Sequence, residues 1–218
     1  MVALKENEIA VSIPLSHVDR IQIYQNTVNP KTRKRKTLAT IMKETGADYA
    51  INGTLYNMRT GAAVCPLKAD GRTYFTGPFK YRGYAWQTLY PQTFKLDIIP
   101  NVQYNNFIAC ANIVKDGKAI EKPIYNAAQG SYRARSAIGT KRVNGEKRIC
   151  FYACTEKKGI RKSPEQLGKL LQSYGWDDAV MLDCGGSSQA YFRKEKRQVY
   201  SLRRVAHYIL VYLKKEYK

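Results

Sequence analysis

The sequence predicts an α+β fold, in which a curved mixed β-sheet carries a few packed helices within a single domain spanning residues 1–218. Three observations lead to this prediction. Extended runs rich in Tyr, Phe, Ile and Thr recur along the chain, two segments have helical periodicity, and no linker rich in Pro, Gly or Ser separates them. A length of 218 residues with 44% hydrophobic residues is also enough to bury a core without a disulfide or metal staple.

The expected strands combine apolar or aromatic residues with flanking turn residues. In chain order they cover residues 9–13, 18–24, 48–51, several stretches between 73 and 114, 147–154, 179–182 and 205–213. Turns such as Thr76-Gly77-Pro78 interrupt the Tyr-rich stretch, and Asn144-Gly145 precedes the strand at 147–154. The last two strands are apolar on both faces, which is typical of the centre of a sheet.

Two helices are expected between these strands. Residues Thr37–Thr45 carry an apolar stripe at i, i+3, i+4 spacing, and a glycine follows as a stop signal. The second helix has the stronger signals, because Ser163 is an N-cap residue and Pro164 occupies the first helical position. Gln166 completes a capping box with Ser163, and Gly175 ends the helix.

The charge balance is strongly basic. There are 37 Lys and Arg residues against 17 Asp and Glu residues, which gives a formal net charge of +20. Such a field attracts anionic polymers, anionic lipid surfaces or a phosphorylated substrate, although a solubilising basic surface would have the same composition. The run Lys31–Lys36 is therefore either a solvated loop or a contact for a polyanion. No base-stacking or recognition motif supports nucleic acid as the partner.

The cysteines and the N-terminal residues indicate in which cellular compartment the protein is expected. The five cysteines have no regular spacing, which argues against a disulfide framework and favours buried free thiols in a reducing compartment. Cys150 and Cys154 have no histidine cluster beside them, so a zinc site is not expected. The first eight residues lack a signal-peptide core, and no membrane-spanning apolar run occurs. We therefore expect a cytoplasmic protein where it is made, which a partner could release.

Three segments carry residues suited to chemistry. Asn52-Gly53 follows a short strand, where a glycine permits close approach to the backbone, although an ordinary turn has the same sequence. Arg133 and Arg135 are two residues apart on an extended segment, so both guanidinium groups are expected on one face and able to bind phosphate, unless this is a plain surface strand.

The third segment begins at Asp183, at the end of the apolar strand 179–182. Two glycines and two serines follow the next residue, and successive backbone N–H groups at 185–188 could form an anion-binding nest with hydroxyl groups beside it. The alternative is a tight connection between two strands.

In order and spacing these segments resemble the phosphodiester glycosidase family, over about residues 45–213. The matching motifs are Asn52-Gly53, the turn Asp70-Gly71, the segment 135–139 (RSAIG), the helix from Ser163 to Gly175, and the segment 182–188 (LDCGGSS). Residues 204–206 also look like the family's closing strand. Two departures occur: residues 54–56 (TLY) stand where the family has Gly-Phe-Phe, and Cys184 replaces the first glycine after the aspartate.

The resemblance implies hydrolysis of a sugar–phosphodiester bond at the anomeric carbon. Such a site needs a carboxylate near that carbon and positive charge on the phosphate. The expected catalytic residues are Asp183 as nucleophile or base, Arg135 on the phosphate, and Asn52. The expected substrate-binding residues are Gly53, Asp70, Arg133, Gly185, Gly186, Ser187 and Ser188, with Asp70 as a candidate second carboxylate. No cofactor and no metal-ligand set is expected, although a divalent metal remains compatible with the sequence.

Two further readings stay open. Cys184 would need a neighbouring base to act as a nucleophile, and His207 is the candidate. A small side chain at a family glycine, with His207 as a core histidine, accounts for both residues more simply. The chain as a whole could also be a non-catalytic binding module for a polyanion or a phosphorylated small molecule.

Overall fold

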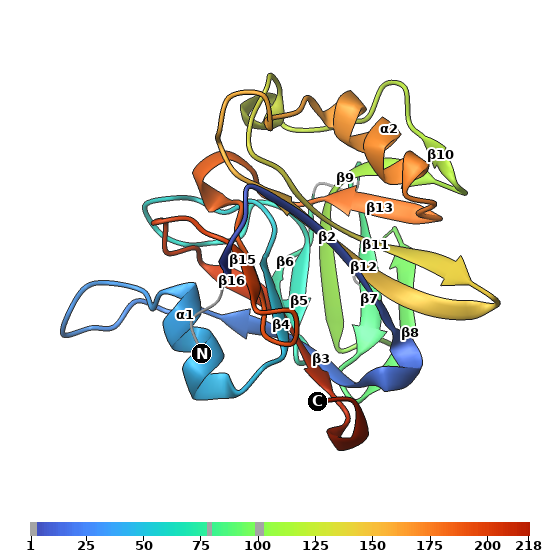
Figure 1. The fold of residues 1–218 in the computed structure, drawn as a ribbon. Coiled ribbons are helices and arrows are strands. Elements are labelled where there is room, and N and C mark those ends of the chain that lie inside the picture. The colour runs from blue at the N-terminus through green and yellow to red at the C-terminus, as the bar shows by residue number, and fades with distance from the viewer. Residues whose placement is uncertain (1–3, 78–79, 99–102) are drawn as a thin grey trace.

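The computed structural model describes residues 4–77, 80–98 and 103–218, and its strands form two sheets packed against each other (Figure 1). The smaller sheet has six strands. In spatial order they are β1 (Leu4–Lys5), β15 (Arg197–Val199), β14 (Ala190–Phe192), β4 (Tyr49–Asn52), β16 (His207–Leu213) and β3 (Val18–Gln25). Neighbours are antiparallel except for β1 and β15, which run parallel.

The larger sheet has ten strands and is antiparallel in its described pairs. Its main path is β2 (Glu8–Pro14), β12 (Glu146–Cys154), β11 (Ser136–Val143), β13 (Asp178–Met181), β9 (Asn106–Lys115), β5 (Leu67–Ala69) and β6 (Arg72–Phe75). Beside this path, β10 (Lys118–Ala119) and β7 (Arg82–Gln87) pair with β9, and β8 (Tyr90–Asp97) pairs with β7. The α+β class is confirmed, with the strands divided between two sheets instead of gathered in one.

Each sheet has one helix on its outer face, and Figure 1 shows the two helices well apart. Helix α1 (Leu38–Thr45) packs Ile41 against β4 and β16, and α2 (Pro164–Ser173) packs Leu167 and Leu171 against β9, β11 and β13. None of the described helices is long and apolar enough to cross a bilayer.

This layering explains why β13 and β16 are apolar on both faces. In β16, Ile209 faces the core between the sheets, whereas Leu210 faces α1. In β13, Val180 faces the same core and Met181 faces α2. Alternate side chains of a strand point to opposite faces, so a strand covered on both sides needs apolar residues at every position. Both strands lie between two neighbours, as predicted.

The predicted helix signals are confirmed. The Thr37 side chain accepts a hydrogen bond from the Thr40 N–H at the start of α1. Ser163 and Gln166 form the reciprocal capping box at the start of α2. The basic run Lys31–Lys36 lies in a loop, as expected. In the turn predicted at 76–78, Pro78 lies outside the described residues.

Gly139 allows the strands around the site to pack closely. A Cβ atom built at Gly139 would lie 2.4 Å from the Asp178 carbonyl oxygen and 2.4 Å from Cε3 of Trp176. Backbone and a buried indole ring can move little in a close-packed interior. We therefore expect Gly139→Ala to lower the free energy of unfolding by roughly 1–3 kcal/mol, measured by urea denaturation.

Gly77→Ala is the matched control for that substitution. Among the described residues, a Cβ atom at Gly77 would have nothing within 4 Å, and Gly77 does not have positive φ. Its unfolding free energy should stay within about 0.5 kcal/mol of the parent chain. Equal stability of the two variants would contradict the packing role of Gly139.

Candidate active site

The candidate site lies where the end of β4 in the smaller sheet meets the end of β13 in the larger one. The Asp183 N–H donates to the Gly53 carbonyl oxygen at 3.1 Å, and the Asp183 carbonyl oxygen accepts from Asn52 Nδ2 at 3.0 Å. The Ser136 hydroxyl donates to the same carbonyl oxygen at 2.7 Å. Segments far apart in the sequence are thereby joined at one point.

The Asn52 side chain is occupied by the backbone around it. Besides its bond to Asp183, Nδ2 lies 3.2 Å from the Gly53 carbonyl oxygen, and Oδ1 accepts from the Gln189 N–H at 3.1 Å. The side chain is fully buried. This geometry favours a positioning role for Asn52, which fixes both ends of the segment 183–189.

Gly53 is needed where β4 approaches His207. A Cβ atom at Gly53 would lie 2.3 Å from Nδ1 of His207, and the Gly53 N–H donates to the His207 carbonyl oxygen at 2.9 Å. His207 is 1% exposed, both of its ring nitrogens lack a hydrogen-bond partner among the described residues, and burial lowers its pKa to about 4. It is therefore a neutral imidazole at neutral pH.

The segment after Asp183 forms a single turn of 3₁₀ helix over Gly185–Ser187. The expected anion-binding nest is not formed. The N–H groups of Gly185, Ser187 and Ser188 already donate to the carbonyl oxygens of Ala134, Cys184 and Gly185. By contrast, the Ser188 hydroxyl is buried without a partner in the described part of the chain.

Asp183 is a buried carboxylic acid with an exposed edge. The residue is 8% exposed, and its Oδ1 accepts from the Cys184 N–H at 2.8 Å. Burial raises the pKa of the Asp183 carboxyl group to about 6, while the Ser187 hydroxyl, the Cys184 N–H and the charge of Arg203 oppose the rise. At neutral pH the group is thus mostly ionised and can still accept a proton.

The two arginines of the second motif do not share a face. Arg133 is exposed, whereas Arg135 is fully buried. Their segment makes an isolated bridge to Lys162 and becomes a regular strand only at Ser136, so side-chain alternation does not hold there. The expectation that both guanidinium groups point the same way is wrong.

The guanidinium group of Arg135 is used within the protein. Nε donates to the Lys162 carbonyl oxygen at 2.7 Å, Nη1 to that of Gln129 at 2.7 Å, and Nη2 to that of Ser131 at 2.5 Å. All three nitrogens therefore already have acceptors. This arrangement favours a role in ordering the loop 129–135 over contact with a phosphate.

Asp70 is not brought to the Asp183 segment. It lies in the turn between β5 and β6, where Oδ1 accepts from the Thr88 hydroxyl at 2.9 Å and Oδ2 from Gln22 Nε2 at 3.4 Å. A different carboxylate lies nearer, because a Cβ atom at Gly185 would be 3.2 Å from Glu156 Oε1. Glu156 is exposed on the loop after β12, and no local sequence signal set it apart.

Sequence reasoning also missed Arg203 and Tyr56. Arg203 Nη1 donates to the Ser187 hydroxyl at 3.1 Å, and its guanidinium group lies against Gly186, where a Cβ atom would be 2.9 Å from Nη2. The Tyr56 ring packs edge-on against His207 with the centroids 5.8 Å apart. Burial raises the Tyr56 pKa, while the Ser187 hydroxyl lowers it. The pair Arg203-Arg204 before the last strand was the available signal.

A surface cavity of about 450 Å³ opens beside this group. Its lining residues are Lys34, Arg35, Tyr56, Met58, Leu202, Arg203 and Arg204. Arg203 thus connects the cavity to Ser187 and, through it, to Asp183. The arrangement combines a carboxylate with a raised pKa, free hydroxyl capacity and a basic cavity wall.

Cys184 has the features of a packing residue. It is 7% exposed, and burial raises the pKa of its thiol to about 11, so the thiol is protonated at neutral pH. Its backbone is extended, with φ −128° and ψ −176°, which any residue adopts without strain. All five cysteines are buried free thiols, as predicted. Within the described residues, no group of three or more His, Cys, Asp or Glu side chains is placed to hold a metal ion.

Two solved structures share the fold. One is the catalytic domain of zebrafish N-acetylglucosamine-1-phosphodiester alpha-N-acetylglucosaminidase, with a TM-score of 0.66 and 12% identity over 95% of this chain and 84% of that chain. The other is a hypothetical protein from Synechocystis, with a TM-score of 0.66 and 14% identity over 95% of this chain and 59% of that chain. A search of curated protein sequences gives no significant match.

A family model gives a more specific result than these distant folds. The model of the phosphodiester glycosidase family matches residues 45–212. The match includes β4, the loop 129–135, α2, and the whole segment from Asp183 to Arg203. It covers well over half of the 218 residues. The chain therefore belongs to the phosphodiester glycosidase family.

Proposed function

We propose that this chain hydrolyses a sugar phosphodiester at the anomeric carbon, with Asp183 as the reacting carboxylate and Arg203 on the phosphate. The observation that carries the proposal is the link from Asp183 through Ser187 to Arg203 at the wall of one cavity. Membership of the phosphodiester glycosidase family supports the same reaction class.

Arg203 replaces Arg135 as the phosphate-binding group in this proposal. Its side chain is exposed to the cavity, and one guanidinium bond to Ser187 holds it in place. The remaining N–H groups can form charge-assisted hydrogen bonds with two phosphate oxygens. The Ser188 hydroxyl, which is buried without a partner among the described residues, is a further candidate to bind a sugar or phosphate oxygen.

The reaction breaks the bond between the anomeric carbon and the phosphate oxygen, and the phosphomonoester leaves with the electron pair. A phosphomonoester is a good leaving group, so strong acid assistance is unnecessary. Asp183 either attacks the anomeric carbon or takes a proton from the attacking water. The product sugar has retained configuration in the first case and inverted configuration in the second, which NMR of the fresh product distinguishes.

The test of this function is a screen of sugar-1-phosphodiesters for released phosphomonoester. Turnover of at least one of them, with little action on aryl glycosides, is the expected result. Cleavage of aryl glycosides alone would make the protein an ordinary glycosidase. Tight binding without release of phosphomonoester would identify a binding module.

Replacement of Asp183 by Asn should abolish turnover. The two side chains are nearly isosteric, but the amide can neither attack nor accept the proton, so we expect kcat/KM to fall by roughly 10²–10⁴-fold. Because the Asp183 pKa is about 6, the activity of the parent chain should fall as pH drops below that value. More than about a tenth of the activity in the variant would exclude Asp183 as the reacting group.

Measuring the stability of the Asp183→Asn variant distinguishes a loss of activity from a loss of folding. The carboxyl pKa rises from 3.8 to about 6 on folding, so ionisation disfavours the folded state as pH rises through that window. Asp183→Asn should therefore gain stability relative to the parent between about pH 4 and pH 7, on the order of 2–3 kcal/mol. A gain independent of pH, measured by urea denaturation, would contradict the burial argument.

The two arginines give opposite predictions. Arg203→Lys keeps the charge but loses the bidentate fork, so a phosphodiester should lose roughly 1.5–3 kcal/mol of transition-state stabilisation and an activated aryl glycoside less. Arg135→Lys removes hydrogen bonds that order a loop, so it should lower stability and affect both substrates equally. Selective loss on the phosphodiester with Arg135→Lys would return the phosphate role to that residue.

A further inference from the structure

The cavity beside the candidate site is basic on most of its wall. Four of its seven lining residues are cations, and its lining includes no carboxylate. They come from two segments, the loop before α1 and the segment before β16. Arg204 Nη1 donates to the Arg35 carbonyl oxygen at 2.9 Å, so the two segments are fixed against each other.

None of these cations forms a salt bridge in the described part of the chain, although Arg203 interacts electrostatically with Asp183. The salt bridges there include none of Lys34, Arg35, Arg203 or Arg204, although neighbouring Lys36 pairs with Glu44. Among the described residues, Nε of Arg35 is buried without a hydrogen-bond partner, and its Nη2 lies 3.5 Å from the Thr60 carbonyl oxygen. Like charges held together with little counter-charge repel each other, so a bound anion would reduce this repulsion.

One phosphodiester group does not use all of these charges. Of the four cations, Arg203 is the one with a hydrogen bond to the segment 185–188 in the described part of the chain, through Ser187, and the proposed function places it on the phosphate at the cleaved bond. Lys34, Arg35 and Arg204 line the same cavity. They are positioned for a second negative charge on the same substrate molecule.

The other lining residues indicate which kind of polyanion fits. Leu202 and Met58 are 84% and 57% exposed, so the wall offers aliphatic contact for a sugar or polyol skeleton. Tyr56, the aromatic residue in the described lining of this cavity, is 8% exposed, so its ring is not open for a base to stack on. Base stacking supplies much of the affinity of proteins for single-stranded nucleic acid.

We propose that Lys34, Arg35 and Arg204 form a second anion subsite, and that the substrate is a polymer of sugar or polyol units joined by phosphodiesters. The subsite binds a phosphate neighbouring the one at the cleaved bond. This inference rests on the proposed function for the reaction, but it makes its own claim about binding.

The binding test uses a fluorescently labelled glycerol-phosphate oligomer and the Asp183→Asn chain, which does not turn it over. The oligomer should bind more tightly than glycerol 3-phosphate, with an affinity that falls steeply as salt rises. The combined change Lys34→Gln and Arg204→Gln should weaken binding about tenfold or more and reduce the salt slope by roughly 1 to 2. Lys34→Gln alone, which removes no side-chain hydrogen bond or salt bridge seen among the described residues, should give part of this effect.

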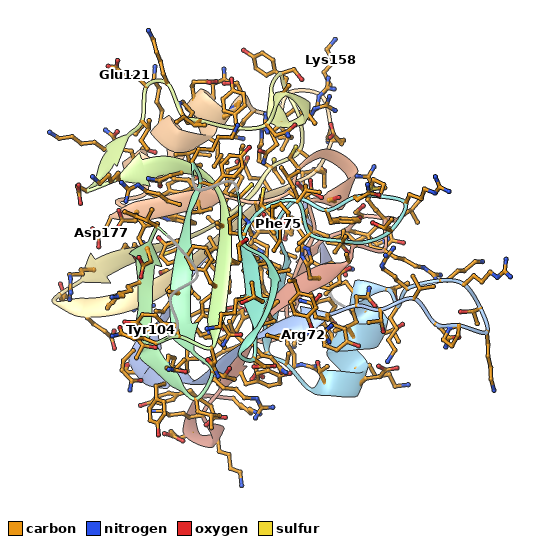
Figure 2. The ribbon with its side chains drawn as sticks, turned by 180° about the vertical axis from the view of Figure 1, so that it is seen from behind. Arg72, Phe75, Tyr104, Glu121, Lys158 and Asp177 are labelled. Carbon is orange, nitrogen blue, oxygen red and sulfur yellow. The ribbon has the colours of Figure 1, made fainter. Side chains whose placement is uncertain are left out.

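The matched control is the combined change Lys118→Gln and Lys122→Gln, which removes the same charge elsewhere. Both residues are exposed, and Figure 2 places Glu121, next to Lys122, far from the protruding loop drawn in light blue that carries Lys34. The control should bind the oligomer as the parent chain does. An equal loss in the control, or an unchanged salt slope in the Lys34 and Arg204 variant, would overturn the subsite.

Two comparisons distinguish the anion subsite from a nucleic-acid site and from the proposed function. A single-stranded oligonucleotide of equal charge that binds more tightly, and loses affinity in the same variant, would overturn the assignment to a phosphodiester glycan. Oligomer binding through the subsite without hydrolysis of any sugar phosphodiester would refute the proposed function and leave the subsite standing. Hydrolysis of small phosphodiesters without oligomer binding would support the proposed function and refute the subsite.

Discussion

The Asn52 side chain is the contact on which the candidate site depends. Its amide group donates to the Asp183 carbonyl oxygen and accepts from the Gln189 N–H, so one buried residue fixes both ends of the segment between them. That segment leaves β13 in the larger sheet and enters β14 in the smaller one. A buried amide or carbonyl without its partner destabilises a protein by about 1–3 kcal/mol, so the geometry is strongly specified. The fixed segment carries the Asp183 carboxylate and the 3₁₀ turn, and its Ser187 accepts the hydrogen bond from Arg203.

Burial, more than residue type, separates the two arginines. Arg135 and Arg203 carry the same guanidinium group, and both lie near the segment 183–189. Arg135 is enclosed by backbone carbonyl oxygens, whereas Arg203 lines a cavity and its guanidinium group has one hydrogen bond, to Ser187, among the described residues. A fully satisfied arginine acts as structure, and a partly satisfied one beside a cavity has donors left for a ligand.

Local signals in the sequence were sufficient for the helices and for the place of Asp183. The capping box at Ser163 and the apolar strand that ends beside Asp183 involve near neighbours, so they could be predicted without a fold. Strands β14 and β15 have three residues each and were not predicted, because so short a run has no measurable period. The division into two sheets and the approach of Arg203 to Ser187 depend on pairing between distant segments, which one sequence does not reveal. The exposure of Arg133 and burial of Arg135 also depend on how an irregular loop closes.

The crossing of the 183–189 segment between two sheets has an evolutionary consequence. Substitutions in Asn52 or Gly53 disturb both layers at once, so selection on the scaffold would restrict them closely. Lys34 and Met58 line the cavity from loops, since both residues are exposed and lie outside the helices and strands. Such loops can change in length and charge while Asp183 stays where it is. Relatives built on this junction can therefore differ in what the cavity binds and still share the arrangement around Asp183.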